Sequence, residues 1–124
     1  MLAASQHGAA SRFGVLEAEY VIAAGGAQPV GLEIPKDSVI FACSARVIST
    51  ITGSATSWTL ALSDGSITFG TGMGLLSGSY CTGILGQPTA IYATKAVRIS
   101  PVGGSFTGGQ LRLAAHFYHI DLPD

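Results

Sequence analysis

Residues 38–63, SVIFACSARVISTITGSATSWTLALS, are the stretch that most constrains the fold of this chain. The stretch is rich in β-branched and aromatic residues, the types that fit a pleated, half-buried surface, and TGS at residues 52–54 interrupts it as a turn would. Beyond the turn, Trp58, Leu60 and Leu62 alternate with small or polar residues, which is the period of a strand with one apolar face. The stretch therefore predicts a hairpin of two apolar strands, with Trp58 in the core.

Shorter strand patterns fill the rest of the chain and are separated by turns rich in Gly and Pro. They cover residues 13–22, 30–34, 67–69, 90–93, 96–100 and 111–119. In the last of these, Leu111, Leu113, Ala115, Phe117 and His119 share one face. Residues 70–86 lose this periodicity, and we interpret them as a long connection across one end of the fold. No segment has apolar residues at helical spacing, so we predict an all-β fold, an antiparallel β-sandwich, jelly-roll-like, with seven to nine short strands and Gly-rich loops.

Length and charge limit the domain organisation and the partners. A chain of 124 residues supports one domain, which we place at residues 13–124, with residues 1–12 as a linker or a segment foreign to the natural protein. Six Lys and Arg side chains cannot form the basic stripe that nucleic acid requires. Residues 65–94 carry no charge, but Gly and Pro break them before any apolar run reaches about 18 residues, so we predict no membrane insertion.

Charged residues make up only 10% of the chain. A surface with so little charge indicates that part of it is covered, and self-association into a homo-oligomer is one way to cover it. The alternative is a monomer whose surface consists of Ser, Thr and Gly.

The sequence predicts no metal or cofactor site. Cys43 and Cys81 lack CxxC spacing, and we expect two buried, reduced thiols, with a single disulfide as the alternative. His116, His119 and Asp121 are the nearest approach to a metal cluster, but positions 116 and 119 of one strand face opposite sides.

The sequence also contains no convincing catalytic motif. Glu17 and Glu19 lie on one face of a predicted strand, where two carboxylates usually do no more than solvate that face. No G-x-S-x-G elbow is present, and GTGMG at residues 70–74 lacks the spacing of a dinucleotide fingerprint. We therefore predict that the chain is not an enzyme.

Three residues are candidates for ligand binding. Tyr80 and Tyr92 lie in or beside the uncharged region, where they either stack against a sugar or pack ordinarily, and Asp64 lies in the turn before it. Arg46 is an anomaly inside an apolar strand, and it either reaches solvent or pairs with a carboxylate across a subunit contact.

Three segments carry a resemblance to a known family: residues 38–62, residues 66–79 (SITFGTGMGLLSGS) and residues 88–118. The most specific parts are ITGSATSW at residues 51–58 and GGSFTGGQLRL at residues 103–113. Together they resemble the C-terminal domain of tail-fibre proteins of alphaproteobacterial prophages and gene transfer agents.

This resemblance implies a distal, β-rich domain of a tail or head fibre on a virion or phage-like particle, acting outside the cell. It also implies a homotrimer that recognises a host cell-surface polysaccharide. A purely structural trimerisation or capping module is the alternative, followed by a glycan-degrading enzyme. The shared motifs are turns and strands, so the resemblance assigns no binding residues.

Overall fold

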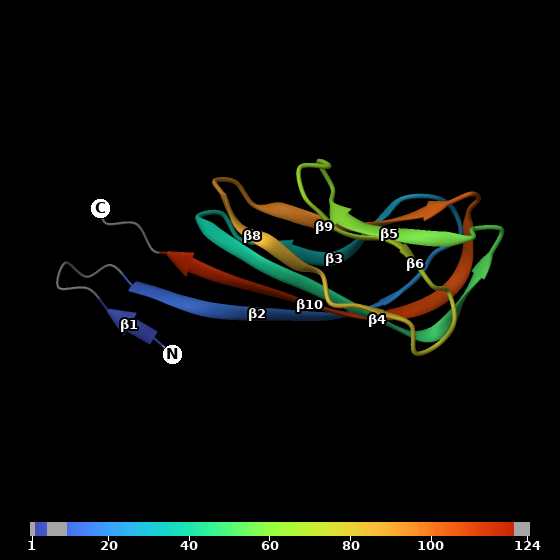
Figure 1. Ribbon diagram of the computed structural model, residues 1–124, viewed down its shortest axis with the longest axis horizontal. Coiled ribbons are helices and arrows are strands. Elements are labelled where there is room, and N and C mark those ends of the chain that lie inside the picture. Colours follow the sequence, from blue (N-terminus) through green and yellow to red (C-terminus); the bar gives the residue numbers. More distant parts are fainter. Residues whose placement is uncertain (1, 5–9, 121–124) are drawn as a thin grey trace.

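The computed structural model describes residues 2–4 and 10–120, and the side chains of residues 13–119. These residues form two antiparallel sheets packed face to face, a β-sandwich (Figure 1). The strands are β1 (Leu2–Ala4), β2 (Ala10–Val21), β3 (Gln28–Ile34), β4 (Ser38–Gly53), β5 (Ser57–Leu62), β6 (Thr68–Met73), β7 (Tyr80–Cys81), β8 (Ile84–Ile91), β9 (Lys95–Val102) and β10 (Phe106–Ile120). Within the described ranges, no helix is long and apolar enough to span a membrane.

The larger sheet has six strands in the order β1-β2-β10-β4-β7, and β8 also pairs with β4. The smaller sheet has four strands in the order β3-β9-β5-β6. In the larger sheet, β10 lies between β2 and β4 and pairs with both over most of its length. The predicted antiparallel β-sandwich is confirmed.

The core lies between the two sheets and comes from the inward faces of both. Trp58, Leu60 and Leu62 of β5 are fully buried, which confirms the core position predicted for Trp58. From the larger sheet, Leu111 and Leu113 meet them in one hydrophobic cluster. The two-residue alternation of strands explains this arrangement, because it turns every second side chain of each strand toward the opposite sheet.

The predicted hairpin at residues 38–63 is wrong in its pairing. Its two strands exist, but β4 belongs to the larger sheet and β5 to the smaller one. Gly53 has φ 130° where the chain leaves β4, and a Cβ there would lie 2.3 Å from the carbonyl oxygen of Ser105. The chain then crosses between the sheets, held by hydrogen bonds from Ala55 N–H to Ser105 and from Thr56 N–H to Val102. Each strand has an apolar face, and placing the strands in opposite sheets brings both faces into one core.

Other predicted boundaries also change. Three strands are long, with 12 residues in β2, 16 in β4 and 15 in β10, because paired neighbours extend the short patterns seen in the sequence. The predicted connection at residues 70–86 contains most of β6, all of β7 and the start of β8. Within the predicted linker, Leu2–Ala4 pairs with residues 10–12 as part of the sheet, and residues 1 and 5–9 lie outside the described residues.

Candidate functional site

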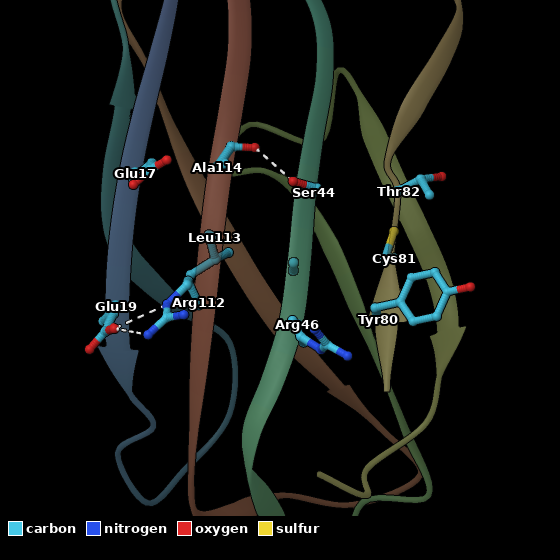
Figure 2. Close-up of a pocket in the computed structure, with 11 residues that line it drawn as sticks. Glu17, Glu19, Ser44, Arg46, Tyr80, Cys81, Thr82, Arg112, Leu113 and Ala114 are labelled. Carbon is cyan, nitrogen blue, oxygen red and sulfur yellow. Dashed lines mark hydrogen bonds and ion pairs between the residues drawn. The ribbon is translucent and has the colours of Figure 1, made fainter. Parts of the chain in front are cut away.

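An open groove of about 850 Å³ lies on the outer face of the larger sheet (Figure 2). It crosses four strands, with β2 on one side, β10 and β4 beneath and β7 on the other side. Glu17 and Glu19 form the β2 wall, while Tyr80 and Thr82 form the opposite wall.

Four side chains of the groove lie in one row across the sheet. The register pairs Arg112 with Glu19, Arg112 with Arg46, and Arg46 with Tyr80. Residues directly opposite in an antiparallel pair point to the same face, so the row Glu19, Arg112, Arg46, Tyr80 faces outward together. The neighbours of Arg112 in β10, Leu111 and Leu113, point inward and are buried. The polar row thus follows from the same alternation that forms the core.

The two arginines of this row are in different electrostatic situations. Both Nε and Nη2 of Arg112 donate to Oε1 of Glu19, at 3.1 and 2.6 Å. Among the side chains of residues 13–119, no carboxylate lies within ion-pair distance of Arg46. Figure 2 shows Arg112 directed toward β2 and Arg46 directed toward β7. The Arg112–Glu19 pair is exposed, so it contributes at most about 1 kcal/mol and mainly orients Arg112.

One row of the groove floor is made of small side chains. In the next row, Glu17 of β2 pairs with Ala114 of β10, and Ala114 pairs with Ser44 of β4. The hydroxyl of Ser44 donates to the carbonyl of Ala114 at 3.4 Å. Because the side chains of Ser44 and Ala114 do not extend far from the sheet, a flat ligand can lie close to the backbone of β4 and β10 here.

The β7 wall is held against β4 by backbone contacts. The carbonyl of Ser79 accepts from Val47 N–H at 2.8 Å, and the carbonyl of Gly83 accepts from Cys43 N–H at 3.2 Å. Gly83 has φ 60°, and a Cβ at this position would lie 1.8 Å from the carbonyl oxygen of Cys43. Only glycine allows this approach, so Gly83 positions the wall that carries Tyr80.

The structure separates the three predicted ligand residues. Tyr80 lies in the groove with 69% of its surface exposed. Tyr92 is also exposed, but it lines a different, shallow pocket of about 290 Å³ together with Lys95. Asp64 forms an ion pair with Lys95 and reaches that pocket only through it.

Asp64 is already engaged within its own turn. The ammonium of Lys95 hydrogen-bonds to its carboxylate, and the backbone N–H and hydroxyl of Ser66 donate to Oδ1 at 2.9 and 2.7 Å. These hydrogen bonds hold the pKa of Asp64 well below its usual range, and the one from Lys95 has the largest effect. Asp64 therefore has a structural role in the β5–β6 turn.

The sequence did not identify the remaining groove residues as a group. The alternation of residues 111–119 puts Arg112 on the face opposite Leu111 and Leu113, and Arg46 is an anomaly in its apolar strand that either reaches solvent or pairs. Arg46 is exposed, although it lies on a strand inside the sheet. In the sequence, the groove is indicated by one arginine on each of two apolar strands. The strand register is needed to show that these two arginines lie opposite each other.

The cysteines and histidines form no metal centre in the described part of the chain. Cys43 and Cys81 are both free thiols, the first buried and the second partly buried. Burial, and in smaller part Cys81, raises the pKa of Cys43 to about 12. His116 is exposed on the outer face, whereas Nδ1 of His119 lies 3.2 Å from the hydroxyl of Ser38. No group of three potential metal ligands occurs among the described residues, and Asp121 lies outside them.

The same outer face carries an aromatic patch, Phe13, Phe41 and Tyr118, at the end where β10 finishes. The ring centroid of Phe13 lies 4.9 Å from that of Tyr118 and 5.7 Å from that of Phe41. Phe13 is 63% exposed, and Val15 beside it on β2 is 53% exposed. Phe41 and Tyr118 are half-buried, and an aromatic cluster that leaves one ring as exposed as Phe13 is typical of an interaction surface.

No protein-family model matches this chain, and a search of curated proteins finds no significant relative. The functional argument therefore depends on the groove, the aromatic patch and the resemblance described above.

Proposed function

We propose that this chain is the non-enzymatic distal domain of a phage-like tail or head fibre, which forms a homotrimer and recognises a host cell-surface glycan outside the cell. The observation that carries the glycan role is the groove, an open, shallow site with an exposed tyrosine, two arginines and a floor of small side chains. Aromatic faces stack against the apolar faces of sugars, and charged side chains hydrogen-bond sugar hydroxyls.

The shape of the groove supports a polymeric ligand. The groove is open and crosses four strands, so a glycan chain can enter and leave at its ends. Buried small-molecule sites, in contrast, enclose most of the ligand surface. The resemblance to fibre domains points to the same ligand class, a polysaccharide on a host cell.

The placement of the carboxylates favours binding over hydrolysis. Glycoside hydrolysis uses two carboxylic groups that flank the scissile bond from opposite sides. Here Glu17 and Glu19 both lie on the β2 wall, and Glu19 is held by Arg112. The facing wall contributes Tyr80 and Thr82, so the described residues provide no carboxylate opposite the glutamates.

The aromatic patch supports the homotrimer. Subunit interfaces are enriched in aromatic residues, and obligate interfaces are more apolar than the rest of the surface. Phe13, Phe41 and Tyr118 supply such a surface, and its occupant in this proposal is a second copy of the chain. The same patch is the observation that favours the alternative, a structural trimerisation or capping module without a ligand.

Binding to immobilised bacterial surface polysaccharides, measured together with light scattering, tests the proposal. We expect a trimer of the 12.6 kDa chain that binds at least one polysaccharide and loses that binding in Tyr80→Ala. The matched control is Tyr92→Ala, which removes a tyrosine outside the groove that is even more exposed than Tyr80 and leaves binding intact. A trimer that binds no polysaccharide would favour the capping module, and a stable monomer would exclude the trimer. Cleavage of the bound polysaccharide would replace binding with enzymatic degradation.

A further inference from the structure

Arg46 and Arg112 are two like charges, and among the described side chains one carboxylate, that of Glu19, forms an ion pair with either of them. They are direct cross-strand partners on an exposed face, an arrangement that destabilises a sheet when nothing lies between the charges. Glu19 takes both hydrogen bonds from Arg112, and the side chains of residues 13–119 offer no carboxylate to Arg46. The groove thus has a guanidinium whose five donors are available to a ligand.

The surroundings of Arg46 are suited to an anionic sugar. Tyr80 is its partner on β7 and is 69% exposed. The adjacent row contains Ser44 of the same strand and Ala114 of β10, whose small side chains leave room for a ring above the sheet. Figure 2 shows the Arg46 side chain extending over the groove between these strands, toward the Tyr80 side.

Charge is also distributed unevenly across the groove. The β2 wall carries the carboxylates of Glu17 and Glu19, which accept hydrogen bonds from sugar hydroxyls but repel an acidic group. The β4 and β7 side carries Arg46 and three hydroxyl side chains, those of Ser44, Tyr80 and Thr82. An acidic sugar is therefore oriented with its carboxylate toward Arg46 and its hydroxyls toward β2.

We infer that the groove binds an acidic glycan. A uronate carboxylate of the glycan accepts hydrogen bonds from the guanidinium of Arg46, and the sugar ring packs against Tyr80. This inference rests on the proposed function and adds the chemical class of the glycan. Arginine is suited to the role because its planar fork matches a carboxylate with two parallel hydrogen bonds.

The test uses three uronate polymers, polygalacturonate, alginate and hyaluronate, each beside its own carboxyl-reduced form. The reduced form keeps the sugar ring and the linkages and carries an uncharged hydroxymethyl group in place of each carboxylate. We expect the protein to bind at least one uronate polymer at least about 10-fold more tightly than the reduced form, because charge-assisted hydrogen bonds are about twice as strong as neutral ones. Arg46→Gln should abolish that preference.

Two controls separate a specific site from general attraction. Lys36→Gln removes one positive charge from the exposed β3–β4 turn, so this variant has the same net charge as Arg46→Gln. It should keep at least half of the wild-type affinity for the uronate polymer. Thermal unfolding checks folding, and Arg46→Gln should unfold at the same or a higher temperature, because it removes the like-charge pair.

The possible failures are distinguishable. If the protein binds none of the three uronates more tightly than its reduced form, or if Arg46→Gln and Lys36→Gln behave alike, the acidic-glycan inference is overturned. Binding to neutral polysaccharides under those conditions would leave the proposed function standing. Absence of binding to all of these polymers and to the surface polysaccharides would overturn both.

Discussion

The indole N–H of Trp58 donates to the carbonyl of Gly74 at 2.9 Å, which ties the centre of the core to the connection that leads toward the groove. Trp58 is fully buried on β5, and Gly74 follows the end of β6. The chain continues from Gly74 to β7, where Tyr80 forms one wall of the groove. Core packing and the shape of the candidate site are therefore linked through one side chain.

Trp58→Phe should lower the free energy of unfolding by about 2 kcal/mol, because it leaves a cavity and an unpaired carbonyl at Gly74. Urea denaturation of the two proteins measures this difference. Tyr92→Phe serves as the control, since this exposed ring should change stability by less than about 0.5 kcal/mol. Equal midpoints for Trp58→Phe and wild type would contradict the role assigned to the indole.

Gly83→Ala should destabilise the protein by more than about 2 kcal/mol, because the added Cβ overlaps the Cys43 carbonyl and the residue has positive φ. It should also weaken glycan binding, since the β7 wall must move away from β4. Gly86→Ala is the matched control on β8, where a Cβ meets nothing within 4 Å. If both variants unfold like wild type, the close contact between Gly83 and Cys43 is not needed.

Phe13→Ser should weaken the proposed trimer and leave the subunit folded. Removing an apolar side chain of this size from an interface costs about 2 kcal/mol for each subunit, so dissociation should occur at markedly higher protein concentration than in wild type. Light scattering over a dilution series measures the change. The control is Val21→Ser. Val21 is an exposed apolar residue on the same face of β2 as Phe13, near the other end of the strand. A Phe13→Ser trimer as stable as wild type would place the interface elsewhere.

Asp64→Asn should reduce stability at neutral pH, and the difference from wild type should shrink in acid. The folded-state pKa of Asp64 is depressed, so its charge stabilises the protein above the unfolded-state value of about 3.9. That contribution is lost as pH falls below this value. Melting temperatures measured from pH 7 down to about pH 2 test this expectation. In a Lys95→Gln background the substitution should have a smaller effect, and a constant difference at every pH would contradict the assignment.

The sequence predicted those parts of the fold that depend on alternation within one strand. Trp58 was placed correctly in the core, on one strand face with Leu60 and Leu62, and Leu111 and Leu113, which were predicted to share one face, are both buried. These positions follow from side-chain period alone and need no knowledge of the neighbouring strand.

The sequence could not predict which strand lies beside which. The turn at residues 52–54 is compatible both with a hairpin and with a connection that crosses between the two sheets, and the structure has the crossing. Long-range contacts distinguish the two arrangements, among them the close approach of Gly53 to Ser105 and the hydrogen bond from Thr56 N–H to Val102.

The groove could not be predicted from the sequence for a related reason. Arg46 and Arg112 are partners only because the register of β4 and β10 shifts at Gln110/Leu111. A slip of one residue would turn one of the arginines inward, so their pairing depends on irregularities in the ladder. Sequence patterns of single strands contain no information about such shifts.

We place the proposed glycan on the outer face of the larger sheet, in the groove around Arg46. Amide chemical-shift mapping by NMR, with an oligomer of whichever uronate polymer binds best, tests this placement. The shifted amides should cluster at Ser44, Arg46, Tyr80, Thr82 and Ala114. Shifts concentrated instead at the loop ends of the sandwich, such as residues 103–106, or around Tyr92 and Lys95, would contradict it.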